Sequence, residues 1–336
     1  MRTVAGGLAL LALLAPATLW AQTKTGTAVG QFLLIEPSAR ITAMGNAGSP
    51  LEGGLDAAYY NPGAIASIEG YQVQLDHSAW LADIAYDYVA VGIPMGKFGT
   101  GYAAVTSLNS GEIDVRTVVQ PLGTGERYRV SNIAIGLGYG RQITDRFSAG
   151  AQASYVQETI YHTSASTFTL GVGTLYQVSE NGLRIGASLS NFGTGEKYDG
   201  RDLHVTSDQD PTINGDNGTL PATVFTDGFP MPVLFRVGLA LPHQFNRDTR
   251  LLVAVEAAHP ADNTESMSFG SELKLRKMVA LRAGWQNAFQ QDTETGLTLG
   301  AGIEGDLETV AFALDYAWAD QGRLGDTHRF SLGLRF

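Results

Sequence analysis

The strongest constraint in this chain is a two-residue alternation of large apolar residues with small or polar ones, which recurs from Tyr71 onward. In "SNIAIGLGYG" (131–140), Ile133, Ile135 and Leu137 fall on one face, and glycines dominate the other. Successive side chains of a β-strand point to opposite faces, so this period predicts strands. Tight turns between the segments, such as "TDR" (144–146), predict antiparallel neighbours.

We expect about fourteen such strands. They lie near residues 71–80, 82–95, 97–109, 129–143, 146–161, 165–177, 182–192, 232–241, 250–259, 266–276, 278–287, 294–304, 307–318 and 327–336. Bacterial outer-membrane barrels have an even strand number, with segments of roughly ten alternating residues. A soluble β-sandwich would also alternate, but these strands are long and their small face is made of Gly, Ala and Ser. The sequence therefore predicts an all-β fold, an antiparallel transmembrane β-barrel of about 14 strands over residues 71–336.

Aromatic and charged residues fit the two faces of such a barrel. Aromatics near strand ends would form two interfacial girdles: Tyr71, Trp80, Tyr139, Tyr155, Tyr161, Tyr176, Trp285, Tyr316 and Trp318. The face opposite the large apolar residues carries Arg236, Glu256, Glu272, Lys274, Arg282, Glu304, Asp315, Arg329 and Arg335. A Lys or Arg on the lipid face costs ~2–4 kcal/mol at the bilayer midplane. We therefore expect these charges in the lumen, as an ion-pair network or as a row that guides a substrate.

The first residues, 1–21, read as a secretory signal peptide. Met1-Arg2 starts the chain with a positive charge, and a short apolar run follows, with cleavage after Ala21 or alternatively after Ala17. An exported chain without cysteine has no disulfide bonds, so burial and backbone pairing must hold it. The net charge of −11 argues against a nucleic-acid surface. These features together predict a protein of the bacterial outer membrane, in contact with its lipid.

The last strand must close the barrel, because an open edge in lipid leaves backbone groups without hydrogen bonds. We expect its arginines, Arg329 and Arg335, to face the lumen. Its lipid-facing residues would be Phe330, Leu332, Leu334 and Phe336. A terminal aromatic on an alternating strand also resembles the signal that the bacterial barrel-insertion machinery reads, and this resemblance implies that machinery as a partner.

Residues 22–70 do not alternate, and glycines and an Asn-Pro interrupt them. Irregular backbone at the level of a membrane is tolerated only where protein or water surrounds it. We therefore expect this segment to plug the lumen. Asn61-Pro62-Gly63 would form a rigid turn, because proline fixes φ and lacks an N–H donor. Arg40 stands among apolar residues and needs an acidic partner, such as Glu36, Glu52 or an acid of the lumen.

The segment 22–70 resembles the N-terminal signature of the PorV/PorQ family of outer-membrane proteins, which is itself similar to the FadL transporters. The residues that carry the resemblance are Phe32-Leu33, Ala39-Arg40, Met44-Gly45 and Asn61-Pro62, with Gly63 where Ala is usual. The stretch 128–160 is also similar to the middle strands of that family. Terminal Phe336 and the number of strands extend the resemblance over nearly the whole chain after the signal peptide.

The resemblance implies two alternative functions. PorV-like proteins serve type IX secretion: they receive exported cargo proteins from the translocon and carry them, and the outer loops would bind the cargo. FadL-like proteins are channels for long-chain fatty acids or other hydrophobic molecules, with the plug as gate and a lateral opening in the wall. Two long connections, 111–128 and 193–231, both follow odd-numbered strands and would lie on the outer face.

We find no constellation that predicts an enzyme or a cofactor. His162 and Ser164 share a strand face as in outer-membrane phospholipases, but they fall at a predicted turn, where Ser and Thr are ordinary. The segment "SDQDPTINGDNG" (207–218) is rich in oxygen ligands for Ca²⁺, yet it lacks the register and the closing Glu of a calcium loop. A solvated loop is the better interpretation, and the sequence predicts no catalytic, metal or cofactor residues.

Overall fold

The computed structural model describes residues 25–179, 182–208, 212 and 220–336. The predicted signal peptide, residues 1–21, and most of the loop considered for Ca²⁺, residues 207–218, lie outside this part of the chain. Within the described ranges, no helix has the length and the apolar character to cross a membrane.

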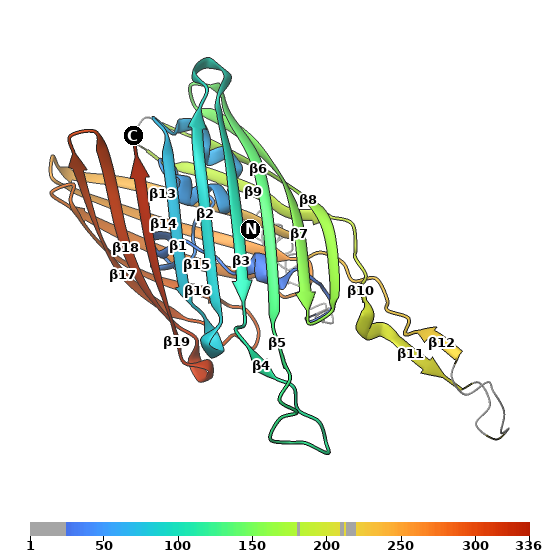
Figure 1. Ribbon diagram of the computed structural model, residues 1–336. Helices are drawn as coiled ribbons and strands as arrows, with labels where there is room; N and C mark the ends of the chain where they lie inside the picture. The colour runs from blue at the N-terminus through green and yellow to red at the C-terminus, as the bar shows by residue number, and fades with distance from the viewer. Residues whose placement is uncertain (1–24, 180–181, 209–211, 213–219) are drawn as a thin grey trace, which may run out of the picture.

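The described residues form a closed antiparallel barrel of 14 strands (Figure 1). The ring closes because β1 pairs with both β2 and β19, and β9 pairs with both β8 and β13. Its strands are β1 (Gln72–Ala79), β2 (Ala85–Pro94), β3 (Thr100–Asn109), β6 (Val130–Thr144), β7 (Phe147–Ile160), β8 (Thr163–Gln177), β9 (Arg184–Gly193), β13 (Leu234–Asn246), β14 (Thr249–Pro260), β15 (Ser266–Leu275), β16 (Val279–Ala288), β17 (Leu297–Leu307), β18 (Val310–Asp320) and β19 (Asp326–Arg335).

The barrel confirms the predicted fold class, and each predicted segment overlaps one barrel strand. The largest difference concerns β13, which continues to Asn246, whereas the prediction ended at 241. Pro242 caused the early stop, because proline cannot donate to a β-ladder and is rare inside strands. The strand tolerates it here: Pro242 pairs in register with Leu252 of β14.

The two ends of the barrel differ in their connections. At the end where β1 begins and β19 finishes, short turns join the strands; we call it the short-turn end (Figure 1). Three of the short connections contain a three-residue 3-10 helix: η5 (Leu81–Asp83) between β1 and β2, η6 (Gly96–Phe98) between β2 and β3, and η8 (Gly322–Leu324) between β18 and β19. Both long connections leave the opposite, long-loop end, which agrees with the predicted parity (Figure 1). Short turns mark the periplasmic side of such barrels, so the long-loop end faces outward.

The long connections are more structured than the sequence indicated. The first carries β4 (Ile113–Asp114) and β5 (Arg127–Tyr128), which pair with each other and form what we call the first arm, residues 110–129. The second arm, residues 194–233, carries β10 (Asp199–Gly200), η7 (Arg201–Leu203), β11 (His204–Ser207) and β12 (Leu220–Thr223). β11 pairs with β12 in a hairpin that projects away from the barrel (Figure 1).

The large apolar and the small residues of the wall point to opposite faces, as the alternation predicted. Leu137 and Phe168 point outward and are largely exposed, whereas Ala134, Ala240 and Ala317 point inward and are buried. One expected girdle residue behaves differently. The indole of Trp80 packs inside the barrel against the apolar cluster around Phe32 and Tyr86, and its ring centre lies 5.0 Å from the guanidinium carbon of Arg329. Trp80 stands just after β1, where the strand alternation no longer decides its direction.

The N-terminal segment lies inside the barrel, as predicted, and we call residues 25–70 the plug (Figure 1). It consists of η2 (Gln31–Leu34), α2 (Ala39–Thr42), η3 (Leu55–Tyr59) and η4 (Pro62–Ser67). Side chains start two of these turns. The Oγ of Ser38 accepts a bond of 3.2 Å from the amide of Ile41, and Oδ1 of Asn61 accepts one of 2.9 Å from the amide of Gly63. Such caps satisfy amides that a short helix leaves without partners.

Candidate functional site

The plug touches the wall through glycines. A methyl group at any of eight wall glycines would come closer than 3.0 Å to a plug atom, which real side chains avoid. We call these residues the glycine belt: Gly140, Gly150, Gly173, Gly186, Gly238, Gly270, Gly284 and Gly300. They come from eight different strands and meet three plug segments, residues 43–45, 49–50 and 61–65. The small face of the strands thus allows backbone-to-backbone approach between plug and wall.

The Asn61-Pro62-Gly63 turn is the most tightly held part of the plug. The side-chain amide of Asn61 donates to the carbonyl of Ser49 at 2.8 Å and to that of Thr174 in β8 at 2.9 Å. A Cβ on Gly63 would lie 2.7 Å from the carbonyl oxygen of Gly173. Alanine, which is usual at this position in the family that the segment resembles, would therefore collide with β8. The glycine suits this particular plug and wall.

Arg40 ties the plug to β15. Its Nε lies 3.1 Å from a carboxylate oxygen of Glu272 in β15, and its Nη1 lies 3.3 Å from Asp56 in the plug. Glu272 also binds Arg282 at 2.7 Å, and Arg282 binds Asp315 at 2.6 Å. We call these five residues the inner charge network. Of the three acidic partners predicted for Arg40, the lumenal one is correct, and it is Glu272.

The other two acids proposed for Arg40 pair elsewhere. Glu52 contacts Arg184 of β9. Glu36 binds Arg236 of β13 at 2.9 Å, and its backbone carbonyl accepts a hydrogen bond of 3.1 Å from Arg329. Burial raises the pKa of Glu36 above its ordinary value, and the charge of Arg236 opposes this shift. The lumenal charges therefore form ion pairs, as expected. Three of these pairs join the plug to the wall: Arg40–Glu272, Glu52–Arg184 and Glu36–Arg236.

The remaining motif residues lie in the apolar contact between plug and wall. Phe32 and Leu33 are buried in a cluster with Tyr86, Leu108, Val156 and Met231. Met44 is fully buried in a second cluster with Leu252 and Ala254, and Gly45 adjoins the backbone of Trp285. The residues of the predicted plug motif thus contact the wall. Among the described residues, they do not form a ligand-binding site.

The four predicted residues of the last strand lie as expected on the outward face of β19. Phe330 and Phe336 are half exposed, and Arg329 points inward beneath them. β19 pairs with β1 from Gln72↔Arg335 to Ala79↔His328, and with β18 on its other edge. The outward position fits contact with lipid. Their role as an assembly signal stays a prediction.

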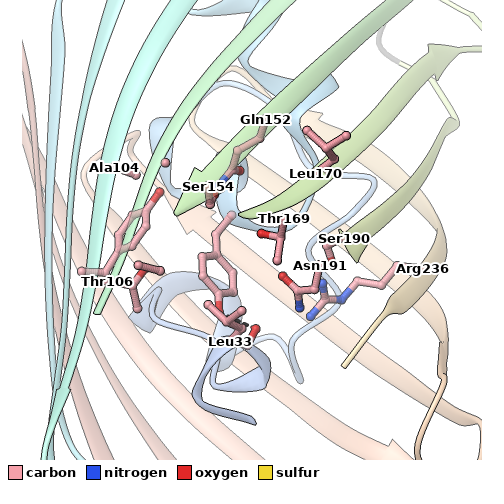
Figure 2. Close-up of a pocket in the computed structure, with 15 residues that line it drawn as sticks. Leu33, Ala104, Thr106, Gln152, Ser154, Thr169, Leu170, Ser190, Asn191 and Arg236 are labelled. Atoms are coloured by element: carbon pink, nitrogen blue, oxygen red, sulfur yellow. Dashed lines mark hydrogen bonds between the residues drawn. The ribbon is translucent and has the colours of Figure 1, made fainter. Parts of the chain in front are cut away.

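A small cavity lies on the outer side of the plug, between Leu33 and the wall (Figure 2). Its volume is about 50 Å³, and Thr106, Gln152, Ser154 and Thr169 line it from the wall. This space holds a few water molecules, whereas a cavity of roughly 150 Å³ is needed to admit benzene. This cavity is therefore too small for an organic molecule.

The same cavity reaches the least regular part of the wall. The β8–β9 register shifts between Leu170 and Val172, and Asn191 on β9 adopts a left-handed φ of 61°. Gly171, Ser190 and Asn191 all line the cavity (Figure 2 labels the last two). On this edge of β8, β9 forms ladder pairs only from Thr169 onward, and β10 pairs only with Thr163 and Ser164. The intervening residues, 165–168, have no ladder partner on this side among the described residues.

His162, considered with Ser164 in the sequence, is bound by the second arm. His162 Nδ1 lies 3.0 Å from Asp202 and its Nε2 lies 2.6 Å from Arg201, both in the second arm, and Ser164 is not one of its partners. Across the described ranges, no group of three or more His, Cys, Asp or Glu side chains is arranged to hold a metal ion.

Comparison with known proteins identifies the fold. No protein-family model matches the chain, and no curated protein matches it. Among solved structures, the Pseudomonas putida toluene transporter TodX is similar at a TM-score of 0.57 and 14% identity, over 89% of this chain and 97% of that chain. The Ralstonia pickettii toluene transporter TbuX is similar at 0.55 and 14% identity, over 90% and 99%. A Pseudomonas aeruginosa FadL homologue is similar at 0.50 and 12% identity, over 87% and 96%.

The chain has the fold of FadL-like outer-membrane barrels. At these identities the likeness concerns the fold, which includes the closed ring of strands and the N-terminal segment inside it. The narrower resemblance to the PorV/PorQ family, which the plug motif, the stretch 128–160 and terminal Phe336 carry, remains a proposal.

Proposed function

We propose that the protein is an outer-membrane channel for hydrophobic molecules. Two of its structural neighbours are toluene transporters and another is described as a monoaromatic hydrocarbon channel, which supports transport and gives no support to an enzymatic role. The observation that carries the proposal in this chain is the outer cavity, which adjoins the bulge between β8 and β9. A hydrophobic molecule would leave the lumen sideways at this bulge and enter the membrane.

The residues around the bulge suit such a route. Phe168 and Leu170 present large apolar side chains to the lipid, and Leu33 and Tyr59 of the plug face the same place from inside. The described conformation is closed, because the cavity holds only water-sized molecules. The glycine belt holds the plug from Ala43 to Ile65, so the segment before α2 is the part that has to move. That segment is held by side-chain contacts, such as the 2.7 Å bond from Tyr59 OH to the carbonyl of Leu33.

A reversible cross-link across the bulge tests the lateral route. The chain has no cysteine of its own, so Leu170→Cys with Phe192→Cys introduces one defined pair at directly opposed positions of β8 and β9. We expect the disulfide to reduce cellular uptake of toluene or oleate at least tenfold, and reductant to restore it. The control pair, Leu239→Cys with Val255→Cys, sits at opposed positions of the regular β13–β14 ladder and should leave uptake unchanged. Uptake that is equal in the two cross-linked proteins would exclude this route.

A second candidate function is that of a carrier for exported proteins, as in type IX secretion. The specific observation that favours it is an apolar tip on the first arm, where Val118, Val119 and Leu122 are 100%, 89% and 94% exposed. Apolar side chains that stand free in water commonly mark protein–protein contacts. In this alternative the translocon and the cargo would dock on the arms, and the plug would stay closed.

One pair of assays separates the two functions. Shortening the second arm between residues 193 and 231 should leave the barrel folded, because exposed loops add little to closure. For a carrier, secretion or surface attachment of cargo should fall while hydrocarbon uptake persists. For a channel, the secreted proteome should be unchanged and uptake altered. An unchanged result in both assays would count against any role of this arm.

A further inference from the structure

The largest cavity lies on the other side of the plug, toward the short-turn end. We call it the inner vestibule. Its volume is about 840 Å³. The plug turn 51–56 and seven wall strands contribute to its lining: β1, β9, β14, β15, β17, β18 and β19. Cavities of roughly 300–1,000 Å³ are typical of small-molecule sites. The inner charge network forms one part of its wall. Its three carboxylates outnumber its two guanidinium groups, so it offers a ligand no excess of positive charge, although Arg282 Nη2 has no hydrogen-bond partner.

A second part of the vestibule wall carries cations in excess. Arg184 from β9, Arg250 from β14 and Lys274 from β15 line it together. Arg250 and Lys274 are directly opposed in the β14–β15 ladder, and Arg250 also repels Arg184. Like charges at opposed positions of a sheet destabilise it. Lys274 forms an ion pair with Glu304, with its Nζ 2.6 Å from the carboxylate, and Arg184 forms one with Glu52. The side chain of Arg250 is half-buried and forms no hydrogen bond or ion pair in the described part of the chain.

A buried donor beside Arg250 is also without an acceptor. The side chain of Arg184 is 6% exposed, and its Nε has no hydrogen-bond partner. A buried donor left without a partner is costly, and a guanidinium is suited to bind carboxylate or phosphate oxygens. Leu51 and Leu252, both buried, line the same cavity, and Leu252 stands two positions from Arg250 on the same face of β14. The cavity thus combines unmatched positive charge with an apolar floor.

We infer that the inner vestibule binds a small organic anion whose carboxylate or phosphate group lies between Arg250 and Arg184. The anion neutralises the repulsion among the three cations and supplies the acceptor that Arg184 Nε lacks, while its organic body rests on Leu51 and Leu252. The plug separates this site from the outer cavity, so the inference does not depend on the transport of hydrophobic molecules. The ligand enters from the short-turn end, which is the periplasmic side.

Calorimetric titration of the purified full-length protein in a non-ionic detergent tests the site. The probe is phenyl phosphate at low ionic strength, with neutral phenyl glucoside as the control ligand. We expect phenyl phosphate to bind, added salt to weaken it, and phenyl glucoside to give no signal. Arg250→Gln should weaken phenyl phosphate binding at least tenfold, and Arg250→Lys should retain most of it because the charge remains.

The matched control variant is Arg247→Gln, which removes the same charge from an exposed turn of the short-turn end outside the vestibule. It should bind phenyl phosphate as the unmodified protein does. Unliganded Arg250→Gln should be at least as stable to heat as the unmodified protein, because it relieves the repulsion with Lys274. Failure of the unmodified protein to bind phenyl phosphate would overturn the inference, as would equal binding by Arg250→Gln. If Arg250→Gln does not fold, Lys274→Gln provides the same comparison from the neighbouring strand.

Discussion

At the scale of single residues, the absence of a methyl group decides how closely the plug approaches the wall. The alternation predicted that the lumenal face consists of small residues. It did not predict which of the glycines contact the plug. The structure separates them: Gly173 adjoins Asn61 and Pro62, whereas Gly171, two residues earlier on the same face of β8, has its nearest neighbour 3.6 Å from where a Cβ would stand. The two positions share a strand and a direction, and they differ in plug contact.

This pair gives a sharp prediction. Gly173→Ala should destabilise the folded protein by about 1–3 kcal/mol, because the added methyl group overpacks the contact with the plug turn. Gly171→Ala should have no cost, or gain up to about 1 kcal/mol, because alanine in a strand restricts the unfolded chain. Urea unfolding of the refolded barrels, followed by tryptophan fluorescence, measures both. If the two variants were equally stable, the plug would adapt to the added methyl group, and the glycine belt would not be what holds it in place.

At the scale of elements, the sequence predicted the barrel strands well because a period of two is a local property of the chain. The plug contacts are not local: Arg40 and Glu272 are 232 residues apart, so the sequence offered several acids for Arg40 and could not choose. The hairpin of the second arm escaped prediction for a different reason. β11 and β12 have four residues each, and β12 contains Pro221, so neither shows a sustained alternation.

The last strand is the element whose removal should matter most. Deleting residues 329–336 removes the ladder partner of β1 and that of β18 at once, which leaves two open edges in lipid. We expect no assembly in the outer membrane and no heat-modifiable band on gels. A deletion of the same length in the first arm, residues 116–123, should keep both properties. Heat-modifiable migration of the C-terminal truncation would contradict the closure argument.

At the scale of the whole molecule, the plug divides the lumen into two unlike spaces. On the outer side lie a cavity of about 50 Å³ beside the irregular wall and one of about 170 Å³ beside Glu36 and Arg236, whereas the inner side holds a space of about 840 Å³ that is lined by charge. Two sets of ion pairs keep this division: Arg236 with Glu36 and Glu256 on the outer side, and the inner charge network on the other. The first set joins the plug to β13 and the second joins it to β15, so the plug is fixed to the wall on both its outer and its inner side.

Arg40→Ala should therefore loosen the plug without opening the ring of strands. It leaves Asp56 buried without its partner, while Glu272 keeps Arg282, so we expect a loss of about 3 kcal/mol, the lower end for a broken buried pair. In planar bilayers the variant should conduct small ions, because a displaced plug joins the two spaces, and the intact protein should not. Arg127→Ala is the control, since its pair with Glu112 on the first arm is exposed and contributes only ~0–1 kcal/mol. If Arg40→Ala unfolds in urea and conducts like Arg127→Ala, the inner charge network is not what anchors the plug.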